Sequence, residues 1–124
     1  MDKLIIDFTI KSTDSSQQFS TVGQLEGNTI SFMDPSNESH TIQFMDDLVD
    51  YRKSGENELR FTFDSQTPTI GTYQTYQYQF EFTVLTTYLQ IEHQHIEIQY
   101  QLYQEEELVN ETSLNLYYEF AKEE

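Results

Sequence analysis

Two neighbouring stretches of the chain alternate strictly between apolar and polar residues. The apolar residues of the first stretch are Tyr76, Tyr78, Phe80, Phe82 and Val84. Those of the second are Ile96, Ile98, Tyr100 and Leu102. A period of two is typical of β-strands that have one dry face and one wet face. Successive strands of this kind must bury their dry faces, and the chain has little helix signal to cover them. The pattern therefore predicts a sheet that curls onto itself.

Shorter alternating segments fill much of the remaining sequence. They are residues 4–11, 19–25, 29–33, 40–45, 48–53, 59–63 and 114–120. Turn-rich segments separate them, and the clearest of these is 34–39. The apolar parity flips around Thr86 and Thr87, which predicts a bulge or a corner. No segment has a capped 3.6-residue stripe, so at most one short helical turn is expected. The prediction is an all-β fold, with residues 1–124 forming one antiparallel up-and-down β-barrel of about 8–10 strands.

The composition excludes some classes of binding partner. The net charge is −16, from 22 acidic and six basic residues. Nucleic acids and anionic membranes are poor partners for such a surface, whereas a basic protein or a second copy of the chain remains open. The chain has no cysteine, and its first residues contain no apolar leader. We expect a cytoplasmic protein without a cofactor.

Two short motifs carry a family resemblance. They are Arg52-Lys53-Ser54-Gly55-Glu56 and Gly71-Thr72-Tyr73-Gln74-Thr75. With the strands at 59–63, 80–86 and 98–102, the chain resembles the YwiB-like family of small bacterial proteins of unknown function. That family has a Pro-Tyr-Gly after the last Thr, where this chain has Tyr76-Gln77-Tyr78. The resemblance implies a calycin-like (lipocalin-like) β-barrel, and it indicates no particular activity because the function of the family is unknown.

The most enzyme-like local feature is His93-x-His95-x-Glu97. In a strand, these side chains share one face at a spacing that suits a metal ion. The neighbouring Ile96 and Ile98 occupy the dry face, which leaves His95 and Glu97 on the opposite face. A solvated strand face is therefore the preferred interpretation. The acidic turns, Asp46-Asp47 and Glu105-Glu106-Glu107, are expected to be solvated rather than catalytic. The sequence therefore predicts no catalytic residue and no metal site, and we expect a protein that is not an enzyme.

The inward faces of the strands nominate a ligand site. The candidate wall of the barrel lumen consists of Phe61, Phe63, Tyr78, Phe80, Phe82, Ile98, Tyr100 and Leu102. Arg52 and Arg60 are candidate anchors at the mouth, although an ion pair with a neighbouring acid is the competing interpretation. The leading hypothesis is a non-enzymatic module that binds a small apolar molecule in the lumen or at the mouth. One alternative is an interaction protein with a filled core and an acidic face. A second is a metal-dependent enzyme built on His93 and His95.

Overall fold

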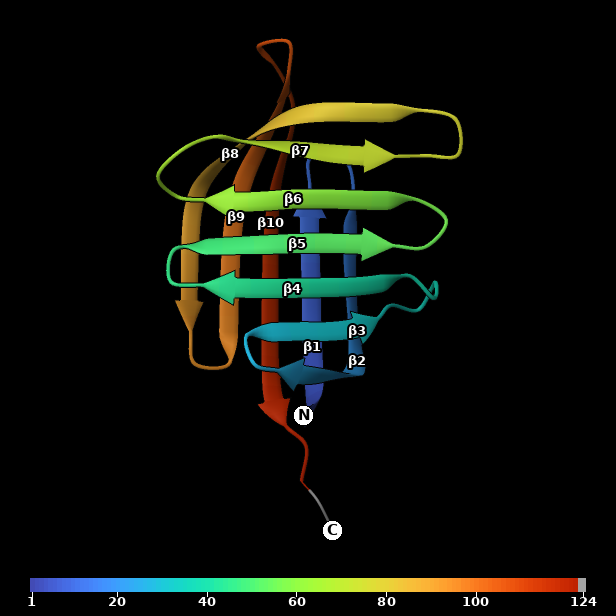
Figure 1. Ribbon diagram of the computed structural model, residues 1–124, viewed down its shortest axis with the longest axis vertical. Helices are drawn as coiled ribbons and strands as arrows, with labels where there is room; N and C mark the ends of the chain where they lie inside the picture. Colours follow the sequence, from blue (N-terminus) through green and yellow to red (C-terminus); the bar gives the residue numbers. More distant parts are fainter. Residues whose placement is uncertain (123–124) are drawn as a thin grey trace.

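The computed structural model describes residues 1–122 and contains ten β-strands (Figure 1). They are β1 (Asp2–Ser12), β2 (Ser16–Glu26), β3 (Thr29–Met33), β4 (Ser39–Met45), β5 (Leu48–Ser54), β6 (Glu58–Asp64), β7 (Thr69–Gln74), β8 (Gln79–Glu92), β9 (His95–Gln104) and β10 (Glu107–Phe120). No α-helix lies between residues 1 and 122, and so none there could span a membrane.

Each strand pairs antiparallel with its neighbours in the chain, and β1 also pairs with β10. The sheet is therefore a closed barrel in the order β1-β10-β9-β8-β7-β6-β5-β4-β3-β2. This confirms the predicted up-and-down antiparallel barrel. Closure pairs the first strand with the last, over nine residue pairs from Leu4↔Phe120 to Ser12↔Thr112.

The barrel is flattened into two layers whose strands cross at a steep angle (Figure 1). Strands β3 to β7 form one layer, while β1, β9 and β10 run across them in the other. Strands β2 and β8 bend so that each takes part in both layers. Bends and bulges are the usual means by which a strand passes from one layer to another. In β8 the pairing register with β9 shifts between Thr86 and Tyr88, which confirms the irregularity predicted from the parity flip.

Side chains fill the space between the layers. The buried apolar core includes Leu4, Ile6, Phe8, Phe19, Ile30, Phe32, Ile42, Val49, Tyr51, Phe61, Phe63, Val84, Ile96, Ile98, Tyr100, Leu102, Leu114 and Leu116. These residues come from the inward parity of nearly every strand. The centre of the barrel is thus a packed core, and any ligand site must lie towards one of its ends.

The aromatic stretch at 76–84 differs in one respect from its prediction. It is not one strand, because Thr75 to Tyr78 form the turn between β7 and β8. Strand β7 was missed, since its short apolar pattern around Gly71 is weak. Parity is preserved, but burial increases only gradually from the turn into β8: Tyr78 is 63% exposed, Phe80 is 38% exposed and Val84 is fully buried.

Candidate functional site

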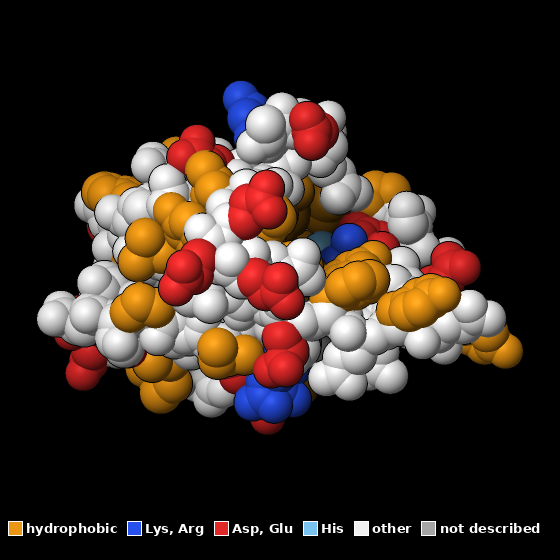
Figure 2. All heavy atoms as spheres, turned by 90° about the horizontal axis from the view of Figure 1, so that it is seen from above, with side chains coloured by type: hydrophobic (Ala, Val, Ile, Leu, Met, Phe, Trp, Pro, Cys, Tyr) orange, Lys and Arg blue, Asp and Glu red, His pale blue; other side chains and the backbone are white. Residues whose placement is uncertain are grey.

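A hollow of about 460 Å³ lies at the end of the barrel towards which the β1–β2, β5–β6 and β7–β8 turns point. Its lining is Ile10, Ser12, Ser15, Ser16, Gln17, Lys53, Leu59, Phe61, Tyr73, Phe82, Tyr100, Leu102, Asn110 and Thr112. We call this the mouth cavity. Figure 2 views the molecule from this end and shows a hollow bordered by hydrophobic side chains, with a basic and an acidic side chain at its edge.

The floor of the mouth cavity is aromatic. The ring centroid of Phe61 lies 6.5 Å from that of Phe82 and 6.0 Å from that of Tyr100, both in edge-on arrangements. Behind them, the ring of Phe63 packs 4.6 Å from Tyr100. Burial raises the pKa of Tyr100 to about 12, although the nearby Thr112 hydroxyl opposes the shift. The phenol therefore stays neutral and presents a polar group within an otherwise apolar floor.

One cation faces into the mouth cavity, and it is Lys53 rather than an arginine. Lys53 shares the inward parity of Val49 and Tyr51 on β5. Its Nζ lies 3.3 Å from a carboxylate oxygen of Glu38, and its side chain is 29% exposed. An ammonium has three donors, so pairing with Glu38 leaves donors available to a ligand.

The predicted position of the two arginines at the mouth is wrong. Arg52 and Arg60 are cross-strand partners on the outer face of β5 and β6. Their Nη2 atoms lie 3.8 and 3.9 Å from the same carboxylate oxygen of Asp50. The competing interpretation, an ion pair with a neighbouring acid, is the one that the geometry bears out. Alternation along β5 explains the difference, since it turns residue 52 outward and residue 53 inward.

The predicted wall residues divide into three groups. Phe61, Phe82, Tyr100 and Leu102 border the mouth cavity. Phe63 and Ile98 are fully buried within the packed core, away from the cavity lining. Tyr78 and Phe80 are exposed and do not line it, which corrects their predicted place in the lumen. They lie in the β7–β8 turn and at the start of β8, before the position where β9 begins to pair, so β9 does not cover them.

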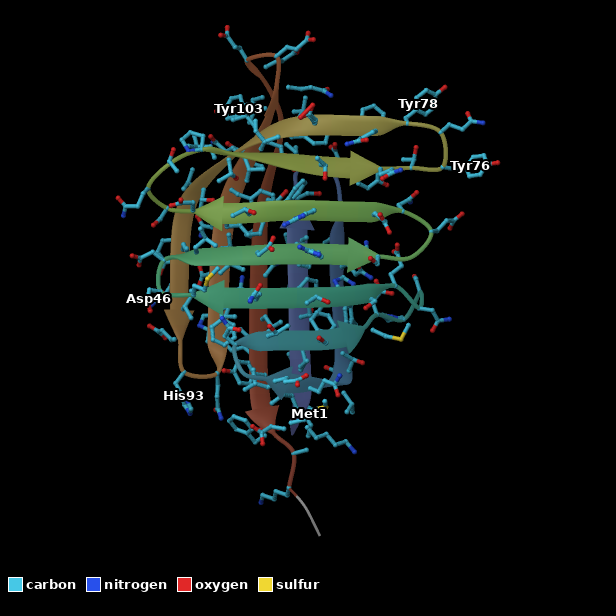
Figure 3. The ribbon with its side chains drawn as sticks, viewed as in Figure 1. Met1, Asp46, Tyr76, Tyr78, His93 and Tyr103 are labelled. Atoms are coloured by element: carbon cyan, nitrogen blue, oxygen red, sulfur yellow. The ribbon has the colours of Figure 1, made fainter. Side chains whose placement is uncertain are left out.

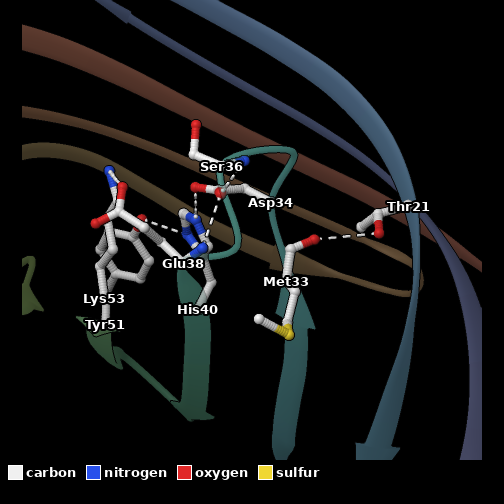
Figure 4. Close-up of polar contacts among 8 residues, drawn as sticks. All are labelled: Thr21, Met33, Asp34, Ser36, Glu38, His40, Tyr51 and Lys53. Carbon is white, nitrogen blue, oxygen red and sulfur yellow. Dashed lines mark hydrogen bonds and ion pairs between the residues drawn. The ribbon is translucent and has the colours of Figure 1, made fainter. Parts of the chain in front are cut away.

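A buried polar network links the β3–β4 turn to β5 (Figure 4). His40 Nε2 lies 2.9 Å from a carboxylate oxygen of Asp34, and His40 Nδ1 lies 2.8 Å from the Tyr51 hydroxyl. The other Asp34 oxygen accepts hydrogen bonds from the backbone N–H groups of Ser36 and Glu38, at 2.8 and 3.0 Å. The carboxylate therefore anchors its own turn as well as the imidazole.

Aromatic rings enclose the imidazole of His40. Phe32 stacks on it at a centroid distance of 4.8 Å and an interplanar angle of 9°. Phe8 and Phe19 close the remaining sides at 5.4 and 6.1 Å. His40 is only 1% exposed, so water has almost no access to the network.

The pKa shifts define the protonation states of this network. Burial lowers the pKa of His40 below its usual value, more than the Asp34 carboxylate raises it. Burial opposes ionisation of Asp34, but hydrogen bonds from His40, Glu38 and Ser36 outweigh it and lower the pKa of Asp34. Burial raises the pKa of Tyr51 far above its usual range. At neutral pH, neutral His40 thus donates from Nε2 to ionised Asp34 and accepts the Tyr51 proton at Nδ1.

Sequence reasoning missed this network. The parity of β4 would have placed His40 inward, together with Ile42 and Phe44. A lone histidine on an apolar face indicates burial without naming its partners, because these come from the β3–β4 turn and from the next strand.

The histidines of the β8–β9 region lie on the outside of the barrel. His93 is exposed in the turn, whereas His95 stacks on Tyr117 at 4.0 Å and lies 3.2 Å from the Asn115 side-chain oxygen. A Glu97 carboxylate oxygen lies 3.9 Å from His95. Within residues 1–122, no group of three or more His, Cys, Asp or Glu side chains is placed to hold a metal ion. The geometry therefore gives the metal-enzyme alternative no support.

The fold and this end of the molecule define a closed ten-stranded β-barrel protein with a packed centre and an aromatic hollow at one mouth. The sequence profile of the family described as "Domain of unknown function (DUF1934)" matches residues 5–116, and the chain belongs to this family. The crystal structure of ywiB protein from Bacillus subtilis is similar, with a TM-score of 0.62 and 12% identity over 97% of this chain and 91% of that chain. This confirms the predicted YwiB-like resemblance. No curated protein matches the chain.

Proposed function

We propose that the protein is a non-enzymatic binding module that takes a small, mainly apolar molecule at the mouth of the barrel. The observation that carries this proposal is the mouth cavity, whose volume of about 460 Å³ falls in the range of about 300–1,000 Å³ typical of ligand sites. A packed core makes the lumen itself unsuitable, so the mouth is the position that the ligand would occupy.

The lining indicates the ligand's chemistry. Phe61, Phe82 and Leu102 offer an apolar surface to a flat or aliphatic body. Lys53 offers a cation at the edge, so the ligand should carry one acceptor group such as a carboxylate, a sulfonate or a carbonyl. Glu38, which already pairs with Lys53, weakens the attraction for a full negative charge. A small apolar body with a single acceptor head fits these features.

Replacing Lys53 with methionine is expected to weaken the binding of an anionic apolar probe about tenfold. This corresponds to about 1.4 kcal/mol, the order of one charge-assisted hydrogen bond. The probe is 8-anilinonaphthalene-1-sulfonate, titrated by its fluorescence at low salt. Glu38→Gln should tighten binding several-fold, because it removes the competing carboxylate from Lys53.

Arg52→Met is the matched control, since it removes the same charge one residue away on the outer face. It should leave probe affinity within about twofold of wild type. Equal weakening by Arg52→Met and Lys53→Met would show that only net charge matters, and would count against a ligand site at the mouth. Absence of saturable probe binding to the wild type would end the proposal.

A further inference from the structure

The barrel has a short unpaired edge on β8. Residues Gln79 to Phe82 pair with β7, from Gln74↔Gln79 to Gly71↔Phe82. Pairing with β9 begins only at Thr83↔Tyr103. Figure 1 shows the start of β8 as the outermost strand of its layer, with the β9–β10 turn projecting beyond it. We call residues 79–82 the open edge.

The hydrogen-bonding phase shows which backbone groups are free on this edge. Thr75 N–H donates to the Tyr78 carbonyl at 2.8 Å, and Tyr78 N–H donates to the Thr75 hydroxyl at 3.2 Å, so Thr75 and Tyr78 form a hydrogen-bonded pair across the hairpin. In an antiparallel ladder, bonded and non-bonded pairs alternate. Gln79 and Glu81 therefore belong to non-bonded pairs, and their N–H and C=O groups point away from β7. An added strand would find two donors and two acceptors there.

Exposed aromatic rings flank the open edge on one side. Phe80 packs 6.4 Å from Tyr73 and 6.3 Å from Tyr78. Tyr76 is 93% exposed, and Figure 3 shows it projecting with Tyr78 at the tip of the β7–β8 hairpin. Tyr76, Tyr78 and Phe80 thus form an apolar surface that no segment within residues 1–122 buries.

Negative charge flanks the edge as well. The side chain of Glu81 alternates with Phe80 and Phe82 and is exposed. The β9–β10 turn adds exposed Glu105, Glu106 and Glu107. The sequence contains no lysine or arginine between residues 61 and 121, so no lysine or arginine of β7 to β10 neutralises this region.

Two glutamates of the β9–β10 turn occupy positions with positive φ, which is unfavourable for glutamate. Glu105 and Glu106 have φ of 51° and 69°. Both positions favour Asn-Gly, because most L-residues are strained at positive φ. Glutamate at both positions places negative charge at the tip of the turn, although Asn-Gly would make the turn more stable.

We propose that the open edge binds an extended, basic segment of another protein, which adds to β8 as a further strand. Side chains opposite Gln79 and Glu81 would share their face, where Glu81 favours Arg or Lys. Side chains opposite Phe80 and Phe82 would meet the aromatic surface. The partner segment therefore alternates basic and apolar residues. A second copy of this chain is disfavoured, because its own Glu81 and Glu105 to Glu107 would face the same acids.

The test uses a dye-labelled peptide of eight residues that alternates Arg and Val, followed by fluorescence anisotropy at low salt. A peptide with Glu in place of Arg is the negative control. The wild-type protein should bind the first peptide and not the second, and added salt should weaken binding. Failure to bind the Arg-Val peptide overturns the proposal.

Variants locate the site. Glu81→Pro removes a free N–H without removing a bond to β7, and it should weaken binding at least tenfold. Glu105→Asn with Glu106→Gly should weaken binding several-fold while raising the melting temperature, so lost binding cannot come from unfolding. Asp46→Asn with Asp47→Asn removes two charges from a distant turn and should change affinity less than twofold.

Amide hydrogen exchange gives a readout that does not depend on any variant. The peptide should slow the exchange of Gln79 and Glu81, which otherwise lack partners. Lys53→Met should bind the peptide as wild type does, which separates this surface from the mouth cavity. Equal weakening by both acid-removal variants, or protection at another face, overturns the proposal. So does a wild-type dimer that Glu81→Pro dissociates, because the edge would then bind a second copy.

Discussion

Replacing His40 with leucine is expected to lower the free energy of unfolding by about 3–5 kcal/mol. Leucine fills much of the imidazole volume among Phe8, Phe19 and Phe32, so packing is largely conserved. The loss arises because the Asp34 carboxylate, 2.9 Å from Nε2, would keep its buried charge without its partner. The Tyr51 hydroxyl would lose its acceptor as well. Urea unfolding at neutral pH measures the loss of free energy. In thermal unfolding, the same loss should lower the melting temperature by roughly 10–20 °C.

Two variants serve as controls for His40→Leu. Tyr51→Phe removes one hydrogen bond and should cost about 1 kcal/mol. His95→Leu replaces a histidine on the outer face, stacked on Tyr117, and should cost less than about 1 kcal/mol. If His40→Leu were no more harmful than His95→Leu, the buried network would not contribute to stability.

The same network predicts a loss of stability in acid. The folded state lowers the pKa of His40 below its ordinary value of 6.5, so the unfolded chain takes up the proton first. The stability due to neutral His40 is therefore present above pH 6.5 and lost as pH falls through the lowered folded pKa. Asp34, whose pKa is also lowered, acts with the same sign at still lower pH. The charged and titratable groups nearest His40 are Asp34, Glu38, Tyr51 and Lys53.

Urea midpoints at pH 8 and pH 5 check this dependence. Wild type should lose stability between the two values, and His40→Leu should lose less. An equal loss in both proteins would assign the acid sensitivity to other carboxylates.

Gly23→Ala is expected to destabilise the protein by about 2–3 kcal/mol, although alanine is normally favoured over glycine within a strand. Gly23 lies where β2 pairs with both β1 and β3, and a Cβ there would approach the Ser31 carbonyl oxygen and the Ile6 side chain to 2.5 Å each. Ile6 could adjust, but the Ser31 oxygen belongs to the adjoining strand of the sheet. Making room for the methyl group would therefore disturb the pairing of β2 with β3.

Gly27→Ala provides the comparison for this prediction. Nothing lies within 4 Å of a Cβ at Gly27, and its φ is +61°. Alanine there should cost about 1 kcal/mol through backbone strain alone. Thermal unfolding of the two variants separates a clash from strain. Gly23→Ala with stability equal to that of Gly27→Ala would show that the strands around Gly23 can relax.

Much of the architecture follows from local pattern. Alternation with a period of two shows which face of a strand each side chain occupies. This alternation is a property of the extended backbone itself. It was enough to predict a closed antiparallel barrel, the irregularity at Thr86 and Thr87, and several side chains that border the mouth cavity. The same alternation implies that Lys53 points inward, because Lys53 shares the parity of Val49 and Tyr51. The arginines were chosen by residue type, and parity would have excluded Arg52.

Alternation does not state how far the neighbouring strands extend. Tyr78 and Phe80 have inward parity yet remain exposed, because β9 begins to pair with β8 only at Thr83. Nor does it name contacts between distant residues. Asp34, His40 and Tyr51 come together through the register of β4 with β5 and the shape of the β3–β4 turn. Parity depends on one residue and its backbone. Burial and interaction partners depend on where the other strands end, and only the tertiary structure determines those positions.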